Sequence, residues 1–468
     1  LASTMDRDES LSGLTDRELF DRLFWLGKEP QNDLMITAQA CALVYSFDGE
    51  DLDGELAQLA ILADQSVLTL YRHVSELQRR GLAQQRGAWR AVLPHAIANT
   101  LAIRALDSIP HSLILRSLVQ GQNRLLRSFS RRLGYLHDSS NAAAIVGKWL
   151  SADGLLGDLT QVDHLQIEVL VNVAPVDPGA ALQVIEGIVR HFDKQSVSNL
   201  DETLRTRIIR LVRSIAYESK YFERCICVLQ AFALAEPQSK KSEETMNVIA
   251  SLFFLYLSGT HATTEQRTDW VRAALTSSNS RIEALGLKCL SNALECRHFS
   301  SHYGFEFGAR KRDYGWSPKR RDAQAWYASY IALATEVGQG NSRIAHQARD
   351  ILAQHFRCLW IVAGVTDALE LSAAHLLNVG WEKGWLAIRQ TLHFDGKGLP
   401  APIKAKLLTL EEQVRPTTLE GHIKAVVLNG YSAGVDFTDG EDISSGIERA
   451  DRLARGLGEL GAEEVAVF

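Results

Sequence analysis

The chain has 468 residues, more than one compact hydrophobic core usually organises, so we expect two or more domains or an extended array of repeats. Its 50 basic and 56 acidic residues give a formal net charge of −6, which argues against a strongly basic nucleic-acid binder but not against a local basic patch. An apolar content of 46% and a charged content of 23% are ordinary for a globular protein.

Six cysteines are scattered through apolar helical contexts without the spacing of a zinc site, so we expect buried thiols in a reducing, cytoplasmic environment. No signal-peptide pattern opens the chain, and the most apolar window, "VIASLFFLYLSG", is too short to span a bilayer. We therefore expect no membrane association. Because the sequence starts at Leu1 rather than Met and ends on "GAEEVAVF", we expect it to be a piece of a longer polypeptide.

Residues 1–30 are expected to form a polar lead and one helix, an N-terminal linker to the next domain. In "TDRELFDRLFWLG", Thr15 is a good N-cap and Glu18 follows three residues later, as in a capping box.

Residues 31–110 show the clearest secondary-structure pattern in the sequence. Two apolar helical segments, "LMITAQACALVYSF" and "DGELAQLAILA", precede a third, "DQSVLTLYRHVSELQRRGL", whose apolar residues recur at helical spacing until Gly81. The stretch "AQQRGAWRAVL" then predicts two short strands around the turn-prone pair Arg86-Gly87. Three helices followed by a β-hairpin predict a winged helix-turn-helix domain.

The rest of the chain predicts a mainly α fold. Helices of about 12–18 residues, such as "DETLRTRIIRLVRSIAYES" and "ETMNVIASLFFLYLS", follow one another with short polar breaks. This pattern favours an α-solenoid of HEAT/TPR-like helical repeats over residues 111–298 and 323–420, and "ALTSSNSRIEALGLKCLSNAL" has the form of a HEAT-like unit. Residues 421–468 are expected to be a Gly/Asp/Ser-rich loop and one last charged helix.

Catalytic motifs are missing from the sequence. It contains no G-x-x-x-x-G-K-[ST], H-E-x-x-H, G-x-S-x-G or C-x-x-C, and "FDGKGLPAP" has neither the spacing of a phosphate loop nor its Ser/Thr. We assign no catalytic residue and no metal site, and whether the chain is an enzyme stays open. A hydrolase with an unrecognised site is the weakest alternative.

DNA binding is the main alternative function that the residues themselves suggest. The third helix of the 31–110 unit carries polar residues that could face a groove and its phosphates: Thr69, Arg72, His73, Gln78, Arg79 and Arg80. An acidic run precedes it: Asp48, Glu50, Asp51, Asp53 and Glu55. These carboxylates would repel a phosphate backbone, so a transcription regulator is kept as the second hypothesis, and nucleic acid is not the favoured partner.

A histidine stands at the junction between the predicted hairpin and the next helix. The segment "LPHAIANTLAIRAL" is similar to the Met-His-Asp segment that ends the winged-helix domain of STAND signalling ATPases, the NB-ARC and NACHT groups. His95 matches the histidine of that motif, whereas Pro94 replaces Met and Ala96 replaces Asp. The resemblance implies that His95 hydrogen-bonds the β-phosphate of ADP, and an imidazole N–H at a helix start suits an anion. The alternative is a polar residue that only begins a helix.

The resemblance extends downstream. The segments "LLRSFSRRLGYLHDSSNAAAIVGKWL", "LFFLYLSGTHATTEQR" and "ECRHFSSHYGFEFGARKRDYGWSPK" resemble parts of large bacterial STAND proteins, many of which act in defence against phage. It implies that the repeats bind a trigger, either a protein or phage component or another copy of the chain. It also implies that ADP or ATP is shared with an upstream NTPase domain and that no cofactor belongs to this chain alone.

Residues 299–322 predict a long insertion between repeats, because glycines interrupt any helix there. Aromatic and basic residues are interleaved in it, a combination that suits stacking on bases or clasping a protein. The candidate partner-binding residues are Phe305, Phe307, Arg310, Lys311, Arg312, Tyr314 and Trp316. The alternative is an aromatic mini-core that fixes the loop to the repeats, with solvated basic residues.

Overall fold

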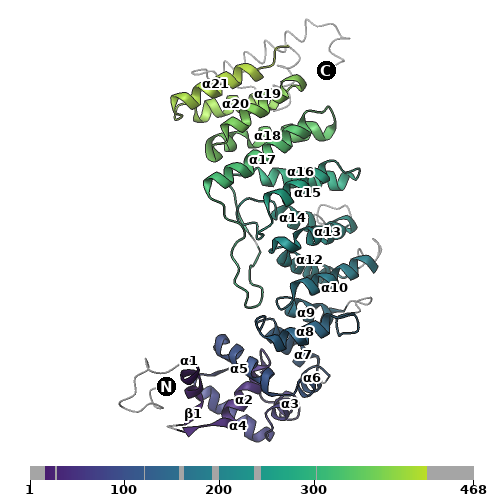
Figure 1. Ribbon diagram of the computed structural model, residues 1–468, viewed down its shortest axis with the longest axis vertical. Coiled ribbons are helices and arrows are strands. Elements are labelled where there is room, and N and C mark those ends of the chain that lie inside the picture. Colours follow the sequence, from purple (N-terminus) through teal and green to yellow (C-terminus); the bar gives the residue numbers. More distant parts are fainter. Residues whose placement is uncertain are drawn as a thin grey trace, which may run out of the picture. The chain divides into compact units, whose positions relative to one another are not determined.

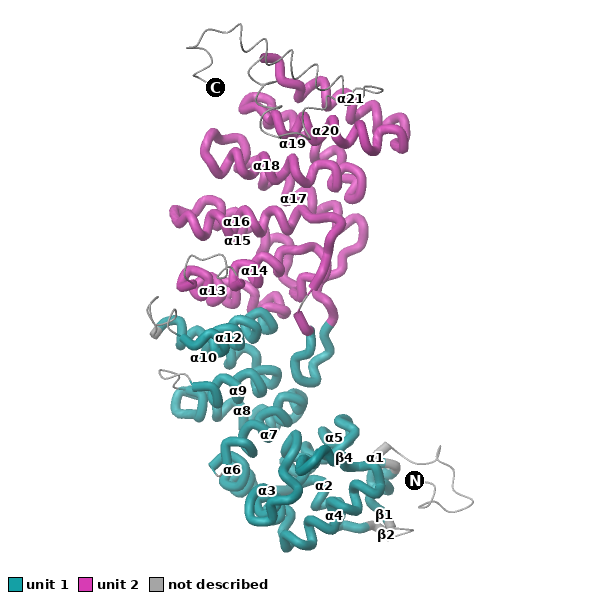
Figure 2. Tube along the Cα trace, turned by 180° about the vertical axis from the view of Figure 1, so that it is seen from behind, with its two compact units in different colours: residues 1–215, 305–312 teal, residues 216–304, 313–468 magenta. Residues whose placement is uncertain are grey.

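The structure is a computed structural model that describes residues 16–26, 29–120, 122–157, 163–191, 200–236, 244–301 and 303–418. The protein is mainly α, as the sequence predicts, and it divides into two compact units (Figure 2). Unit 1 comprises Leu1–Ile215 and Phe305–Arg312, and unit 2 comprises Ala216–Gly304 and Asp313–Phe468. No helix in the described part of the chain is long and apolar enough to cross a membrane. The loop and helix expected over residues 421–468 lie outside the described residues.

The first part of unit 1 combines short helices with two small sheets. Its elements are α1 (Asp16–Asp21), a 3-10 turn (Arg22–Phe24), β1 (Trp25–Leu26), β2 (Glu29–Pro30), α2 (Asn32–Ala42), β3 (Phe47–Asp48), α3 (Glu55–Leu62), α4 (Val67–Arg79), β4 (Ala83–Arg86) and β5 (Trp89–Val92). The helix expected from Thr15 onward is shorter than the sequence pattern predicts, because the chain turns at residue 22 and pairs as β1 and β2.

Helix α4 illustrates how the sequence sets the local structure. The Ser66 side chain accepts a hydrogen bond from the Thr69 amide and caps its start, and Leu70, Val74 and Leu77 form its buried stripe. Gly81 follows with φ +71°, a left-handed conformation that glycine adopts without strain. Strands β4 and β5 then pair antiparallel, with Arg86 opposite Trp89, and β3 pairs with the other edge of β5. This sheet ends next to the start of α5.

The remainder of unit 1 is helical. Its helices are α5 (His95–Ser108), α6 (His111–Leu118), α7 (Asn123–Leu133), α8 (Ser140–Leu150), α9 (His164–Val173), α10 (Pro178–His191) and α12 (Glu202–Ile215). Helix α2 packs on α5, α5 on α8 and α8 on α10, while α7 packs on α9 and α9 on α12. Two rows of neighbouring helices result, and α7, α9 and α12 lie side by side (Figure 1).

Unit 2 contains helices that pack in two layers. They are α13 (Ser219–Ala235), α14 (Glu244–Ser251), α15 (Thr264–Leu275), α16 (Ser280–Ala293), α17 (Arg320–Gly338), α18 (Arg343–Cys358), a π-helical turn (Leu359–Ala363), α19 (Thr366–Leu376), a 3-10 turn (Leu377–Val379), α20 (Glu382–Asp395) and α21 (Ala401–Val414). Helices α14, α16, α18 and α20 contact one another in succession, and α15, α17, α19 and α21 do the same. Within each layer, a helix therefore packs against the next helix of that layer.

Helix α14 ends earlier than the sequence predicts. The apolar pattern of "ETMNVIASLFFLYLS" continues to residue 258, but the helix stops at Ser251. Beyond it, the fully buried Arg267 donates hydrogen bonds to the carbonyls of Leu252 and Phe254, and these bonds stabilise the non-helical path of the chain there. Periodicity does not reveal this contact, because Arg267 comes from the next helix, α15.

Candidate functional site

His95 is the first residue of α5, and Pro94 occupies the N-cap position. Its imidazole is exposed at the end of the sheet and belongs to a cluster of three rings. The ring centroid lies 5.2 Å from that of Tyr45, with Nε2 3.5 Å from the Tyr45 hydroxyl. The Tyr135 ring is nearly parallel to the imidazole, 6.1 Å away at 5°, and its centroid is also 6.1 Å from that of Tyr45. The predicted nucleotide-contacting histidine therefore faces solvent and does not lie within an apolar core.

A pocket of about 300 Å³ opens beside His95 and is lined by residues of β4, β5 and the Tyr45–Ser46 turn. Arg86 lies at its edge, exposed and without an ion-pair partner among the described residues. Arg90, in contrast, is buried and donates to the Gly87 carbonyl at 2.7 Å. The pocket thus presents one histidine at a helix start and one available guanidinium, a pair of groups that suits an anion.

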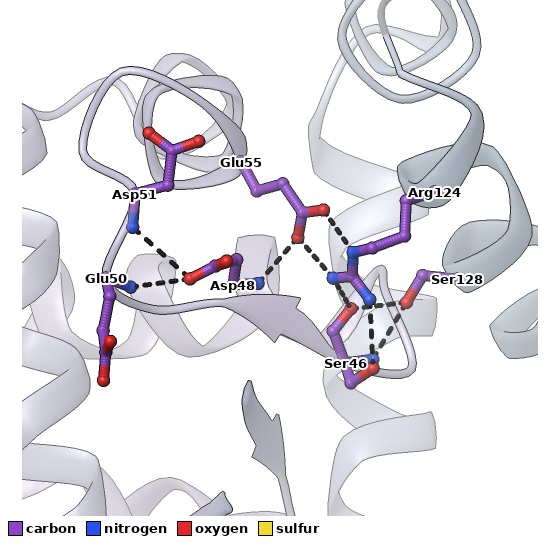
Figure 3. Close-up of polar contacts among 7 residues, drawn as sticks. All are labelled: Ser46, Asp48, Glu50, Asp51, Glu55, Arg124 and Ser128. Atoms are coloured by element: carbon purple, nitrogen blue, oxygen red, sulfur yellow. Dashed lines mark hydrogen bonds and ion pairs between the residues drawn. The ribbon is translucent and has the colours of Figure 1, made fainter. Parts of the chain in front are cut away.

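The acidic run that precedes α4 in the sequence, from Asp48 to Glu55, supports the wall of this pocket (Figure 3). Glu55 forms an ion pair with Arg124 and accepts a hydrogen bond from the Asp48 amide at 2.7 Å. Arg124 also lies over the Trp89 ring, 4.4 Å from its centroid, and Trp89 lines the pocket. The Asp48 carboxylate accepts hydrogen bonds from nearby amides (Figure 3), and the Asp51 carboxylate accepts one from the Gly54 amide, so these carboxylates mainly order a turn.

Charge around His95 favours its neutral form. Partial burial lowers the pKa of the imidazole, and the positive charges of Arg132 and then Arg131 lower it further, against a smaller opposite effect of Glu306. Arg131 lies over the Tyr45 ring at 3.8 Å from the centroid. A neutral imidazole retains one N–H, so His95 can still donate a hydrogen bond to an anionic oxygen.

Most of the polar residues that could make α4 a DNA reader already have protein partners. His73 Nδ1 lies 3.0 Å from both Thr37 Oγ1 and Gln65 Oε1, and Gln78 donates to Gln85. Arg80 donates to Glu76 and to the carbonyls of Leu23 and Trp25, and Arg79 pairs with Glu76 at 3.0 Å. Thr69 belongs to the helix cap described above. Arg72 is the exposed basic residue of α4 without a partner among the described residues.

In the part of the predicted insertion that belongs to unit 1, the arginines form hydrogen bonds with neighbouring main-chain carbonyls. Arg310 donates to the carbonyls of Pro175 and Val176, just beyond α9, and Arg312 donates to the Ser214 carbonyl in the last turn of α12. The Arg312 guanidinium also lies 3.9 Å from the ring centroid of Phe307, which is buried. Phe305 is half-buried, whereas Lys311 is exposed. Arginines that satisfy helix carbonyls are held in place and are less available to a partner.

The predicted residues that belong to unit 2 are Tyr314 and Trp316. The Trp316 amide donates to the Thr260 carbonyl at 3.0 Å, and its ring lies 6.0 Å from that of Trp326. The Tyr314 carbonyl accepts from the Gly259 amide, and its side chain is exposed. Helix α17 begins at Arg320, so it includes the last residues of the predicted insertion. Lys311 and Tyr314 are therefore the most exposed of the seven candidates.

Several residues around these sites were not singled out from the sequence. Tyr45, Tyr135 and Arg131 surround His95, and Arg207 and Arg210 lie on the exposed face of α12. The arginines at i, i+3 and i+4 spacing in "NRLLRSFSRRL" and "ETLRTRIIRLVRSI" were the available signal, because such spacing places them on one helix face. Among the described residues, no group of three or more His, Cys, Asp or Glu side chains could hold a metal ion.

Comparisons with known proteins do not add to this description. No family model and no curated protein matches the chain. One solved structure that matches is the crystal structure of an engineered protein from the Northeast Structural Genomics Consortium, at 11% sequence identity and a TM-score of 0.28. The match covers 91% of this chain and 99% of that one, but at this TM-score it carries no argument.

Proposed function

We propose that this chain is the sensor and regulatory portion of a STAND-type signalling ATPase in the cytoplasm, possessing a winged helix that responds to ADP or ATP and helical repeats that bind a trigger. In this proposal the nucleotide is held mainly by an upstream NTPase domain. The observation that carries the proposal is the exposed His95 imidazole at the start of α5, beside a pocket that also offers Arg86. A walled-off imidazole would have removed the basis for the proposal.

The proposed role of His95 is to stabilise the ADP-bound form. Its neutral ring would donate one N–H to a phosphate oxygen, and the helix N-terminus behind it adds favourable partial charge. Arg86 would contribute a full positive charge to the same anion. Signalling would then be a shift between a closed ADP form and an open ATP form, which requires that the trigger bind the open form more tightly.

Support for an interaction role over DNA binding comes from the surface of α3 and α4. Leu68 and Tyr71 are exposed by 57% and 42%, one turn apart on α4, and Ile61 of α3 is also exposed. A helix that reads DNA presents polar side chains to base edges, whereas the exposed side chains here include these apolar residues, and most polar residues of α4 other than Arg72 have protein partners. It suits packing against another protein domain, as the winged helix of a larger ATPase would require.

The two-layer packing of unit 2 favours HEAT/TPR-like repeats, because the helices from α14 to α21 contact the next helix of their own layer and because α15 and α16, α17 and α18, and α20 and α21 pack as sequence neighbours. One candidate trigger surface is a groove of about 380 Å³ between α17 and α19. Leu371, which lines it, is 61% exposed, and Thr335 and Glu336 add polar groups. An apolar groove with a polar rim is typical of protein-binding surfaces.

The decisive experiment measures ADP release from the polypeptide that contains this chain and its upstream sequence. We expect His95→Ala to speed ADP dissociation about tenfold, since one hydrogen bond to a charged oxygen is lost. His164→Ala is the matched control, because His164 is also an exposed first residue of a helix, α9. Equal ADP release from wild type and His95→Ala would contradict the proposal. Salt-sensitive, sequence-selective DNA binding abolished by Arg72→Ala would favour the transcription-regulator alternative.

A further inference from the structure

A second pocket lies within unit 1, away from the β4–β5 hairpin. Its volume is about 420 Å³, within the range of small-ligand sites. Residues of α7, α9 and α12 line it together with the segment Phe305–Arg312. The pocket was not anticipated from the sequence, because its fourth wall comes from a segment about ninety residues further along the chain.

The fourth wall is fixed by close backbone packing and by a side-chain hydrogen bond. A Cβ atom at Gly308 would lie only 2.0 Å from the Gly134 carbonyl oxygen, and Gly308 has φ +58°, so this position requires glycine. The Tyr135 hydroxyl donates to Glu306 at 2.9 Å. Arg310 and Arg312 anchor the same segment through the helix carbonyls described above. The pocket is therefore a preformed feature of unit 1.

Three arginines line this pocket, Arg131 from α7 and Arg207 and Arg210 from α12. Arg207 and Arg210 are one turn apart and exposed. Arg210 forms no hydrogen bond or ion pair with any residue that the structure describes, and Arg207 has a long contact of 3.8 Å with Glu168. Glu168 is shared, because it also pairs with Arg127 at 3.2 Å. The available positive charge thus exceeds the available negative charge.

The negative charge that lines the pocket comes from Glu306, whose carboxylate already accepts the Tyr135 hydroxyl. Three basic groups against one acidic group leave a net local charge of about +2, in a chain whose formal net charge is −6. A local excess of this kind attracts an anion with two or more charges. The remaining wall is apolar, from Val171, Pro175, Leu211 and Phe307.

From this combination we propose that the pocket binds a small phosphorylated ligand of the nucleotide class. Arginine forks match phosphate oxygens, and the apolar wall with the Tyr135 ring would receive a planar base. A long polyanion is disfavoured because the chain is acidic overall and because the arginines converge on one pocket of limited volume. The site is distinct from the His95 pocket, and the inference does not rest on the proposed ATPase function.

Side chains that line the two pockets nevertheless touch one another. Arg131 and Tyr135 line the larger pocket, while Arg131 lies over Tyr45 and the Tyr135 ring stacks on His95. A phosphate that attracts Arg131 would draw its charge away from Tyr45 and from His95. Occupancy of the larger pocket would therefore alter the environment of the histidine without touching it.

The test is isothermal titration calorimetry of the complete 468-residue chain with ADP, AMP and inorganic pyrophosphate. We expect ADP to bind more tightly than pyrophosphate, because the base adds apolar contact, and binding to weaken as salt is raised. Arg207→Ala and Arg210→Ala should each reduce the ADP affinity about tenfold or more. Arg205→Ala, on the same helix but outside the pocket lining, should leave it unchanged.

Four results would overturn the inference. The first is no measurable heat or protection from thermal unfolding with any of the three probes. The second is equal ADP affinity in Arg207→Ala, Arg210→Ala and Arg205→Ala. The third is equal affinity for pyrophosphate and ADP, which would reject the nucleotide class. The fourth is tighter binding of a single-stranded oligonucleotide than of ADP, which would make the arginines part of a nucleic-acid surface. Because Arg207 and Arg210 are exposed, circular dichroism should show all variants folded.

Discussion

The arginines of the segment Phe305–Arg312 and those of α12 belong to the same unit but meet different partners. Arg310 and Arg312 donate to main-chain carbonyls at the ends of α9 and α12. Arg207 and Arg210 remain exposed. Of the two, Arg207 has one long contact, with the Glu168 carboxylate, which is already paired with Arg127. The first pair completes the fold, and the second pair is available to an anion. Residue type alone does not separate these two roles.

Helix α7 contains the same contrast in adjacent residues. Arg131 is exposed above the Tyr45 ring, whereas Arg132 is 0% exposed and donates to Asn99 Oδ1 at 2.7 Å. Burial lowers the pKa of Arg132 to about 10, because the charged form loses hydration. Burying an arginine in this way costs hydration free energy. Removing it also destabilises the fold, because the groups around it have adapted to its shape.

The largest expected effect comes from comparing Arg132→Ala with Arg131→Ala. Arg132→Ala leaves a cavity and an unpaired Asn99 oxygen, so we expect the free energy of unfolding to fall by about 2–4 kcal/mol. Arg131→Ala should change it by about 0.5 kcal/mol or less, as for most exposed positions. Urea unfolding followed by circular dichroism measures both. Equal stability of the two variants would show that the buried guanidinium contributes nothing to unit 1.

A smaller effect is expected within the inserted segment. The double variant Arg310→Ala/Arg312→Ala removes three hydrogen bonds to carbonyls and the contact with Phe307, and should destabilise the chain by about 1–3 kcal/mol. Lys311→Ala, between them, should be neutral to within about 0.5 kcal/mol because its side chain is exposed.

The same variants test the predicted recognition role of the insertion. If the basic residues bind the trigger directly, Lys311→Ala alone should reduce trigger-dependent activation of a polypeptide that contains the proposed upstream NTPase domain. If they serve the fold, activation should fall only with Arg310→Ala/Arg312→Ala, in parallel with thermal stability. Loss of activation in the double variant at unchanged stability would contradict the structural role.

Local patterns predicted the local structure well. The mainly α character, the end of α4 before Gly81 and the strands on either side of the Arg86-Gly87 turn all follow from short-range periodicity and turn residues. The length of α14 did not follow, because Arg267 from the next helix stabilises the non-helical residues beyond it through the carbonyls of Leu252 and Phe254. Such contacts between elements depend on tertiary structure and leave no periodic signal.

The candidate sites show the same limit. His95 was found from a short motif, since its place at a helix start is a local property. The Tyr45 and Tyr135 rings that flank it are separated by ninety residues of sequence, and neither belongs to a motif. The arginine pocket could not be predicted, because it requires three helices and the inserted segment to meet. Those contacts determine which arginines stay available to bind an anion.

The smallest expected effect is electrostatic and concerns His95. Burial lowers the pKa of the imidazole most, followed by Arg132 and then Arg131, so Arg131→Ala should raise that pKa by removing a nearby positive charge. Histidine NMR titration measures this shift, with His95→Gln to identify the signal. Arg127→Ala, one turn earlier on α7, is the matched control because its charge is paired with Glu168.

ADP should move the His95 pKa in the same direction if it neutralises Arg131 in the larger pocket. A pKa that stays unchanged with Arg131→Ala and with ADP, or that responds equally to Arg127→Ala, would show that the two pockets are electrostatically independent.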